Sequence, residues 1–148
     1  KILDSNYEHC SNDEILYEKK LIKLGIAEVG DEIKPGEIFP IEANLDYLNG
    51  IDFQKGCFIG QEVSSRMYRK GKAKKRIVGF TSNDSFTNND ELVINDRTIG
   101  TVIKKIESYG IALIKIDKLI NPERETITIT SKDKKKKIDI NMPSFFPI

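Results

Sequence analysis

Short apolar runs alternate with polar turns through the carboxyl-terminal half of the chain. The runs are KKRIVGFTS, ELVIN, TIGTVIKKI, GIALIKI, ETITITS and KKIDIN, and the turns between them include TNND, NDR and SYG. The last two runs place isoleucine at alternate positions, as half-buried strands do. Six short strands with close connections predict a small antiparallel β-barrel, because closure of a sheet removes exposed edges. The stretch KDKKKK at 132–137 is then most simply a solvated hairpin tip.

One helix is predicted near the amino-terminal end, over SNDEILYEKKLIKLG. Ser11 and Glu14 have the spacing of a capping box, in which each side chain satisfies a backbone N–H at the start of a helix. Tyr17, Leu21 and Leu24 follow at helical spacing, with Ile15 and Ile22 beside them. A glycine then supplies the end of the helix.

The segment that follows, residues 25–50, is rich in residues that form turns. It carries Gly30, Pro35, Gly36, Pro40 and Gly50, which suit turns and a loop closing over a neighbour better than long regular structure. The strand-like texture begins only near residue 74. We therefore place a domain boundary near residue 72, with residues 1–72 and 73–148 on either side.

Composition narrows the class of protein. The chain has 148 residues, 39% hydrophobic and 32% charged, and no apolar run approaches the roughly 18 residues of a membrane span. We therefore expect no membrane partner. Two cysteines do not make a disulfide scaffold, so a reducing compartment is expected. The chain shows no signal or transit peptide and begins without methionine, and we expect it to be a fragment of a longer protein.

The net charge of +1 conceals an asymmetry along the chain. Residues 1–62 hold 6 Lys or Arg against 13 Asp or Glu, whereas residues 63–148 hold 18 against 10. The two parts therefore carry charges of −7 and +8. Opposite charges favour contact between the two parts, and the basic part is suited to a polyanion.

The stretch KGCFIGQE places Cys57 between two glycines. A structural interpretation makes this cysteine a small buried hydrophobe, as most free cysteines are. A functional interpretation uses Gly56 and Gly60 for close approach of a ligand, and nearby basic residues to favour the reactive thiolate. Spacing alone leaves both interpretations open. No second cysteine stands at a metal-ligand spacing, so a metal site from this chain alone is not expected.

A basic run follows the cysteine stretch. It interleaves cations with an aromatic residue, Tyr68, and could contact phosphates while the ring stacks on a base. The alternative is a solvated linker and strand edge, where lysines discourage edge pairing. No phosphate loop or dinucleotide fingerprint occurs in the sequence. The candidate basic-patch residues are Arg66, Arg69, Lys70, Lys72, Lys74, Lys75 and Arg76.

The stretch FPIEANLD offers Glu42 and Asn44 as candidate ligand-binding residues. A carboxylate there could hold a pterin-like ring through paired hydrogen bonds. In isolation the same residues are typical of turns and helix caps, and both interpretations stay open.

Taken together, PIEANLD, GIDFQKGCFIGQEVSSR, the basic GKAKKR and the later IGTV resemble the YgfZ-type branch of the folate-binding, aminomethyltransferase-like superfamily. The hallmark of that branch is KGC, then Phe or Tyr, any residue, and GQE. The residues that match it are Lys55, Gly56, Cys57, Phe58, Gly60, Gln61 and Glu62. The resemblance runs from about Leu16 to Pro122.

The resemblance implies an α+β fold. Residues 1–72 would be the carboxyl-terminal part of an interrupted α+β folate-binding body that carries the KGCFIGQE loop, and residues 73–148 would be a six-stranded antiparallel barrel. Family members have a longer amino-terminal part that supplies much of the site for tetrahydrofolate. Glu42 and Asn44 would be what remains of that site in this chain.

The resemblance also implies a function. Members of the branch act as accessory proteins, rather than catalysts, in iron–sulfur cluster assembly or repair, and they support cluster-dependent enzymes that modify tRNA. The motif cysteine carries that role, which transfers to Cys57. We therefore expect a key thiol, a transient cluster with ligands from a partner, and a monomer in the bacterial cytoplasm or, alternatively, the mitochondrial matrix.

Two other functions remain open at the level of sequence. One is a folate-dependent aminomethyltransferase of the glycine-cleavage type, although the cysteine signature speaks against it. The other is a basic module that binds RNA such as tRNA through residues 63–148.

Overall fold

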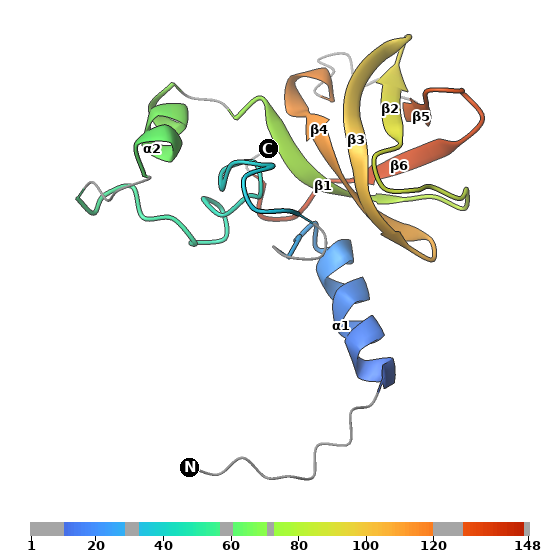
Figure 1. The fold of residues 1–148 in the computed structure, drawn as a ribbon, viewed down its shortest axis with the longest axis horizontal. Helices are drawn as coiled ribbons and strands as arrows, with labels where there is room; N and C mark the ends of the chain where they lie inside the picture. The colour runs from blue at the N-terminus through green and yellow to red at the C-terminus, as the bar shows by residue number, and fades with distance from the viewer. Residues whose placement is uncertain (1–10, 29–32, 57–60, 71–72, 120–128, 147–148) are drawn as a thin grey trace.

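The computed structural model describes residues 11–28, 33–56, 61–70, 73–119 and 129–146, with the backbone alone for residues 11–13 and 61. Two helices precede an all-β region (Figure 1). No helix in these residues has both the length and the apolar character needed to cross a membrane. The elements are α1 (Ser11–Lys23), α2 (Gln61–Arg69), β1 (Lys75–Thr81), β2 (Glu91–Ile94), β3 (Arg97–Ile106), β4 (Tyr109–Lys115), the 3₁₀ turn η1 (Ile116–Lys118), β5 (Ile129–Ser131) and β6 (Lys137–Asn141).

The six strands form a closed antiparallel barrel in the order β1-β4-β3-β2-β5-β6. The first strand closes the barrel by pairing with the last, for example at Phe80 and Ile140. The β2–β3 hairpin turns through Asn95 and Asp96, both with positive φ, which suits the twist of a tight hairpin. The α+β class and the six-stranded barrel expected from the sequence are therefore confirmed.

The interior of the barrel is a packed apolar core. The largest of its fully buried side chains is Phe80, whose ring packs edge-on against Phe86 with 5.9 Å between the ring centroids. Gly110 pairs with Phe80 across β1 and β4 and leaves the space that the ring fills. The buried core residues are Val78, Phe80, Phe86, Leu92, Ile99, Val102, Ala112, Ile114, Ile129, Ile138 and Phe146.

A second, smaller core lies outside the barrel, where the amino-terminal part packs against β1 and β4. Its buried residues are Ile22, Ile33, Ala43, Ile77 and Ile111. Strand β1 is consequently buried on both faces, which explains its nearly unbroken run of buried positions. The amino-terminal part and the barrel thus share a hydrophobic interface.

Helix α1 ends as the sequence predicts. Gly25 has φ +69°, its N–H donates to the carbonyl of Ile22, and the N–H of Ile26 donates to the carbonyl of Leu21. This pair of bonds is the Schellman arrangement that ends many helices. The capping box proposed for the start of the helix involves the Ser11 side chain, which lies outside the described part of the structure.

The apolar stripe of α1 is not the side that is buried. Ile22 is 1% exposed beneath the second core, whereas Tyr17 and Leu24 are 53% and 44% exposed. Only part of the helix contacts the barrel, and Figure 1 shows its amino-terminal end projecting away from the body. The helical spacing therefore predicted the helix correctly, but it did not identify the packed face.

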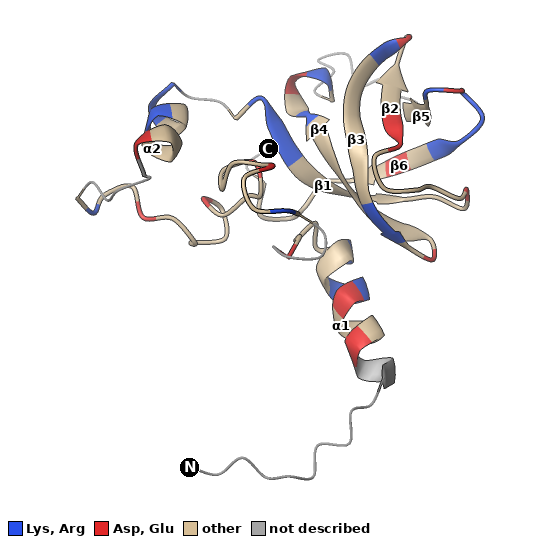
Figure 2. Ribbon diagram, viewed as in Figure 1, with Lys and Arg blue, Asp and Glu red and all other residues tan. Residues whose placement is uncertain are grey.

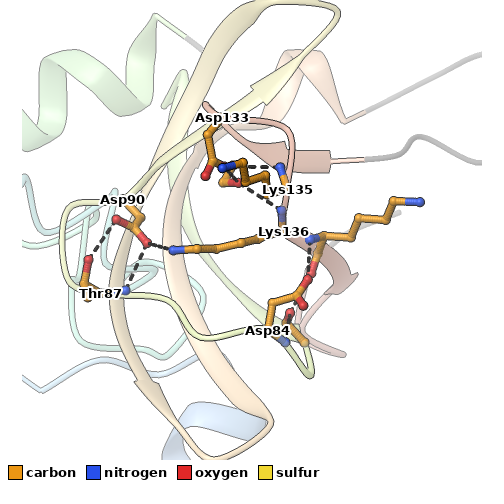
Figure 3. Close-up of polar contacts among 9 residues, drawn as sticks. Asp84, Thr87, Asp90, Asp133, Lys135 and Lys136 are labelled. Atoms are coloured by element: carbon orange, nitrogen blue, oxygen red, sulfur yellow. Dashed lines mark hydrogen bonds and ion pairs between the residues drawn. The ribbon is translucent and has the colours of Figure 1, made fainter.

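The lysine-rich hairpin between β5 and β6 is solvated at its tip but fastened at its base. Lys136 Nζ lies 3.0 Å from Asp90 Oδ2 and 5.1 Å from the centroid of the Phe86 ring. Asp84 Oδ2 accepts a hydrogen bond from the backbone N–H of Lys137. These contacts join the hairpin to the β1–β2 loop (Figure 3).

The same network holds Asp90 in its ionised form. The backbone N–H and the hydroxyl of Thr87 both donate to its carboxylate, at 3.0 and 2.8 Å, and Lys136 adds a third donor. The Thr87 N–H, the Thr87 hydroxyl and Lys136, in that order, lower the pKa of Asp90 below its ordinary value.

Candidate functional site

The candidate site centres on α2, which follows directly after the KGCFIGQE loop. No glycine or proline interrupts the sequence from Gln61 to Lys70. Glu62 lies in the first turn, while Arg66 and Arg69 lie in the last, an arrangement that complements the helix dipole. The sequence interpretation weighed the basic run as a phosphate-contacting patch or a solvated linker and predicted no helix, although the charge order of its ends was a usable signal.

The structure describes only part of the motif. The side chain of Lys55 and the position of Gly56 are exposed, and Glu62 is exposed on α2. Cys57, Phe58 and Gly60 lie outside the described residues, as does the side chain of Gln61. The role assigned to Cys57 therefore stays a prediction from the sequence.

An aromatic pair joins the two sides of the motif loop. The rings of Phe53 and Tyr68 are stacked, with 3.9 Å between centroids and an angle of 12° between planes. Phe53 precedes the undescribed residues 57–60, and Tyr68 follows them on α2. Asp52 shapes the approach to the loop, because its Oδ1 accepts the backbone N–H of Gln54 at 2.8 Å.

A pocket of ≈ 420 Å³ lies along α2. Among the described residues it is lined by Glu62, Ser65, Arg66, Arg69 and Lys70, which share one face of the helix. The cations of this face are exposed, and basic residues also mark the beginning of β1 (Figure 2). The structure thus brings part of the candidate basic patch together.

Lys74 and Lys75 are also exposed, at the point where the chain enters β1. Lys72 lies outside the described residues. The described exposed members of the patch are therefore on α2 and on the segment entering β1.

Arg76 does not belong to an exposed patch, and its assignment there is wrong. Its side chain is 8% exposed and that of Asp46 is 7% exposed. The guanidinium forms two parallel bonds of 2.7 Å to the carboxylate of Asp46. Nη1 also donates to the carbonyl of Ile41, and the guanidinium lies 4.2 Å from the centroid of the Tyr47 ring. Arg76 therefore fastens the turn-rich segment to the first strand of the barrel.

The two candidate folate residues are also used within the protein. Asn44 is 0% exposed, adopts φ +63°, and donates from Nδ2 to the carbonyl of Ile77 at 2.8 Å. Glu42 Oε2 accepts the backbone N–H of Phe39 at 2.9 Å, and its own carbonyl accepts the N–H of Ile77. These are the contacts of turn and docking residues. Asn44 is fully buried, so its amide is not open to a ligand, whereas Glu42 is half-buried and its assignment to a folate site stays a prediction.

The described residues contain no candidate metal site, since no group of three or more of their His, Cys, Asp and Glu side chains could hold an ion. Both cysteines and the single histidine lie outside that part of the chain. The prediction that a cluster at Cys57 would need ligands from another molecule is therefore left as it stood.

A closed six-stranded antiparallel barrel docked against a turn-rich, helix-containing segment defines the class of this protein. Residues 74–148 match the family described as "CAF17, C-terminal beta-barrel domain", and the chain belongs to this family.

The proteins that resemble this chain in sequence carry one kind of name. A Dictyostelium discoideum protein named "Iron-sulfur cluster assembly factor IBA57 homolog, mitochondrial" is 45% identical over 73 residues, which are 49% of this chain and 17% of that protein. The Homo sapiens protein named "Iron-sulfur cluster assembly factor IBA57, mitochondrial" is 30% identical over 104 residues, 66% of this chain and 29% of that protein. The chain therefore spans less than a third of the length of these relatives.

A solved structure supports the fold. The aminomethyltransferase T of the glycine cleavage system from Bartonella henselae superposes with a TM-score of 0.64 and 18% identity, covering 86% of this chain and 37% of that one. At that identity the likeness concerns the fold alone. The resemblance to aminomethyltransferase-like proteins inferred from the sequence is confirmed at this level.

Proposed function

We propose that this chain is the carboxyl-terminal part of an iron–sulfur cluster assembly factor and acts as an accessory protein rather than a catalyst. The observation that carries the proposal is the barrel of residues 74–148, which belongs to the CAF17 barrel family, together with relatives named as iron–sulfur cluster assembly factors. The finer part of the proposal, support of enzymes that modify tRNA, rests on the resemblance of the KGCFIGQE motif.

Within this proposal Cys57 is the residue that binds the cluster. A thiolate is the form of cysteine that binds iron, and nearby cations favour it. The exposed Lys55 precedes the cysteine and the cationic α2 follows it, so both flanks supply positive charge. The cluster is cargo in this scheme: Cys57 supplies one ligand in transit, and a partner supplies the others.

The test compares two cysteines in the complete gene product. Cys57→Ala should abolish rescue of a deletion strain, measured as the activity of a cluster-dependent enzyme, while the abundance of the variant protein stays normal. Cys10→Ala is the matched control, because Cys10 matches no position of the motif. Full rescue by Cys57→Ala would refute the role of this thiol, and equal loss in both variants would point to a general effect of cysteine removal.

A mitochondrial location is part of the proposal. The names of the relatives include the word mitochondrial, which favours the matrix over the bacterial cytoplasm expected first from the sequence. Fractionation of cells that express the tagged complete protein tests this, with co-purification in the matrix fraction as the expected result.

Folate binding is proposed only for the complete protein. Glu42 is the remaining candidate contact in this chain, because Asn44 is buried and bonded to Ile77. Titration of the complete protein with tetrahydrofolate tests the proposal, and Glu42→Gln should weaken the affinity. Turnover of an aminomethylated carrier with tetrahydrofolate would instead establish the rival aminomethyltransferase function.

A further inference from the structure

Among the described residues, the cations of the α2 region lack the ion pairs that several lysines of the barrel form. On the barrel, Lys132 pairs with Glu91 at 2.8 Å, and Lys136 pairs with Asp90 at 3.0 Å. Within the described residues, no carboxylate pairs with the exposed cations Arg66, Arg69 and Lys70 of the α2 region. Exposed cations that form no ion pair are available to the carboxylates of a partner.

The exposure of the α2 residues favours a broad partner over a small molecule. Sites for small ligands bury most of the ligand within a concave wall. Glu62, Arg66, Arg69 and Lys70, which line the α2 pocket, are all exposed. Such a surface suits a broad partner that covers it from outside.

The neighbours of the cations argue against a polyphosphate. Glu62 lies on the cationic face itself, where its carboxylate would repel a phosphate backbone. Val63 and Tyr68 beside that face are 49% and 56% exposed, so the surface mixes apolar and charged groups. One face of the Tyr68 ring is already occupied by Phe53, which reduces what it offers a base. Mixed apolar and cationic surfaces are typical of contacts between proteins.

We propose that α2 is the docking surface for an acidic segment of a protein partner, with Arg66, Arg69 and Lys70 contacting its carboxylates and Val63 contacting its apolar residues. This inference rests on the proposed function in one respect: the partner would be the protein that shares the cluster with Cys57. The surface begins four residues after that cysteine, so docking at α2 brings the partner to the thiol loop.

The experiment measures fluorescence anisotropy of a labelled peptide that alternates pairs of Glu and Leu, added to the complete protein. The same peptide with Gln in place of Glu, and a short single-stranded oligouridylate, are the comparison probes. The Glu peptide should bind, with an affinity that falls as salt rises, and the Gln peptide should bind much more weakly.

The key variant is Arg66→Gln with Arg69→Gln. It should weaken binding of the Glu peptide about tenfold, since each partly exposed charge contact contributes roughly threefold. Lys132→Gln with Lys135→Gln removes the same charge from the β5–β6 hairpin and should leave binding unchanged. Arg66→Lys with Arg69→Lys keeps the charge and should keep most of the affinity, which separates loss of charge from loss of the helix.

Three outcomes would overturn the inference. The first is that the Glu peptide does not bind, and the second is that the hairpin variant weakens its binding as much as the α2 variant does. The third is that oligouridylate binds more tightly than the Glu peptide through the same arginines, which would assign the surface to RNA. The inference and the proposed function fail separately. Full rescue by Cys57→Ala would remove the thiol role without changing peptide binding, because that substitution leaves the cations of α2 in place.

Discussion

The buried ion pair between Arg76 and Asp46 should be the most costly polar contact to break in the described structure. Both side chains are less than a tenth exposed, at 8% and 7%, and the two 2.7 Å bonds are parallel. Removing one partner of such a pair leaves an unpaired charge in a poorly hydrated place, which costs about 3–5 kcal/mol. We therefore expect Arg76→Met and Asp46→Leu each to lower the free energy of unfolding by about that amount.

The double variant should be more stable than either single variant. Replacing both charges with apolar side chains removes the unpaired charge, and such replacements are often close to neutral. A cost of about 1 kcal/mol should remain, because the carbonyl of Ile41 loses its bond from Arg76 Nη1. The two single effects should therefore be strongly non-additive.

Urea unfolding followed by far-ultraviolet circular dichroism measures these changes, and tyrosine fluorescence is an independent probe because the chain has no tryptophan. The single variants should also melt about 10 °C lower. Asp96→Asn is the control, since Asp96 and its partner Lys134 are 73% and 62% exposed and should contribute less than about 1 kcal/mol. Single effects below about 1 kcal/mol, or additive effects in the double variant, would refute the reasoning.

Two further predictions concern the barrel. Gly110→Ala should destabilise it by about 1–3 kcal/mol, since the new methyl group would meet the buried ring of Phe80. Gly56→Ala is the control, because its methyl group meets nothing within 4 Å. Equal midpoints of urea unfolding for the two variants would contradict the argument. Because folding lowers the pKa of Asp90, its ionised form stabilises the protein above the ordinary carboxyl range, and this contribution is lost as the pH falls through the lowered value. Asp90→Asn should flatten the acid side of a plot of melting temperature against pH, whereas the control Asp139→Asn should not. An unchanged acid slope in Asp90→Asn would exclude Asp90 as the source of the loss of stability in acid.

The barrel could be predicted from the sequence because its signals are local. Alternation of apolar residues and short turns define each strand within a few positions, as in the β2–β3 hairpin with its Asn95-Asp96 turn. Pairing of the first strand with the last is not local, but closure follows once six short strands must all avoid an exposed edge.

The predictions that failed depend on contacts between distant parts of the chain. Arg76 was assigned to a basic patch because six other cations precede it, yet its surroundings are set by Asp46, thirty positions earlier. Asn44 was assigned to a ligand, yet its amide meets a strand that begins far along the sequence. Helix α2 was missed for a different reason: a dense run of cations resembles a solvated linker unless the charge order of its ends is considered.

Closure of the barrel by β1 and β6 has a consequence for synthesis on the ribosome. Strands β1 to β4 can pair as soon as Lys115 has emerged, but they leave β1 and β2 each with an unpaired side until β5 and β6 arrive. Because β5 and β6 are the last two strands of the barrel in chain order, the nascent sheet keeps two open edges until β6 has emerged as far as Asn141. Nascent chains that stop before β6 should therefore be retained by chaperones or aggregate, whereas the complete barrel has no free strand to offer.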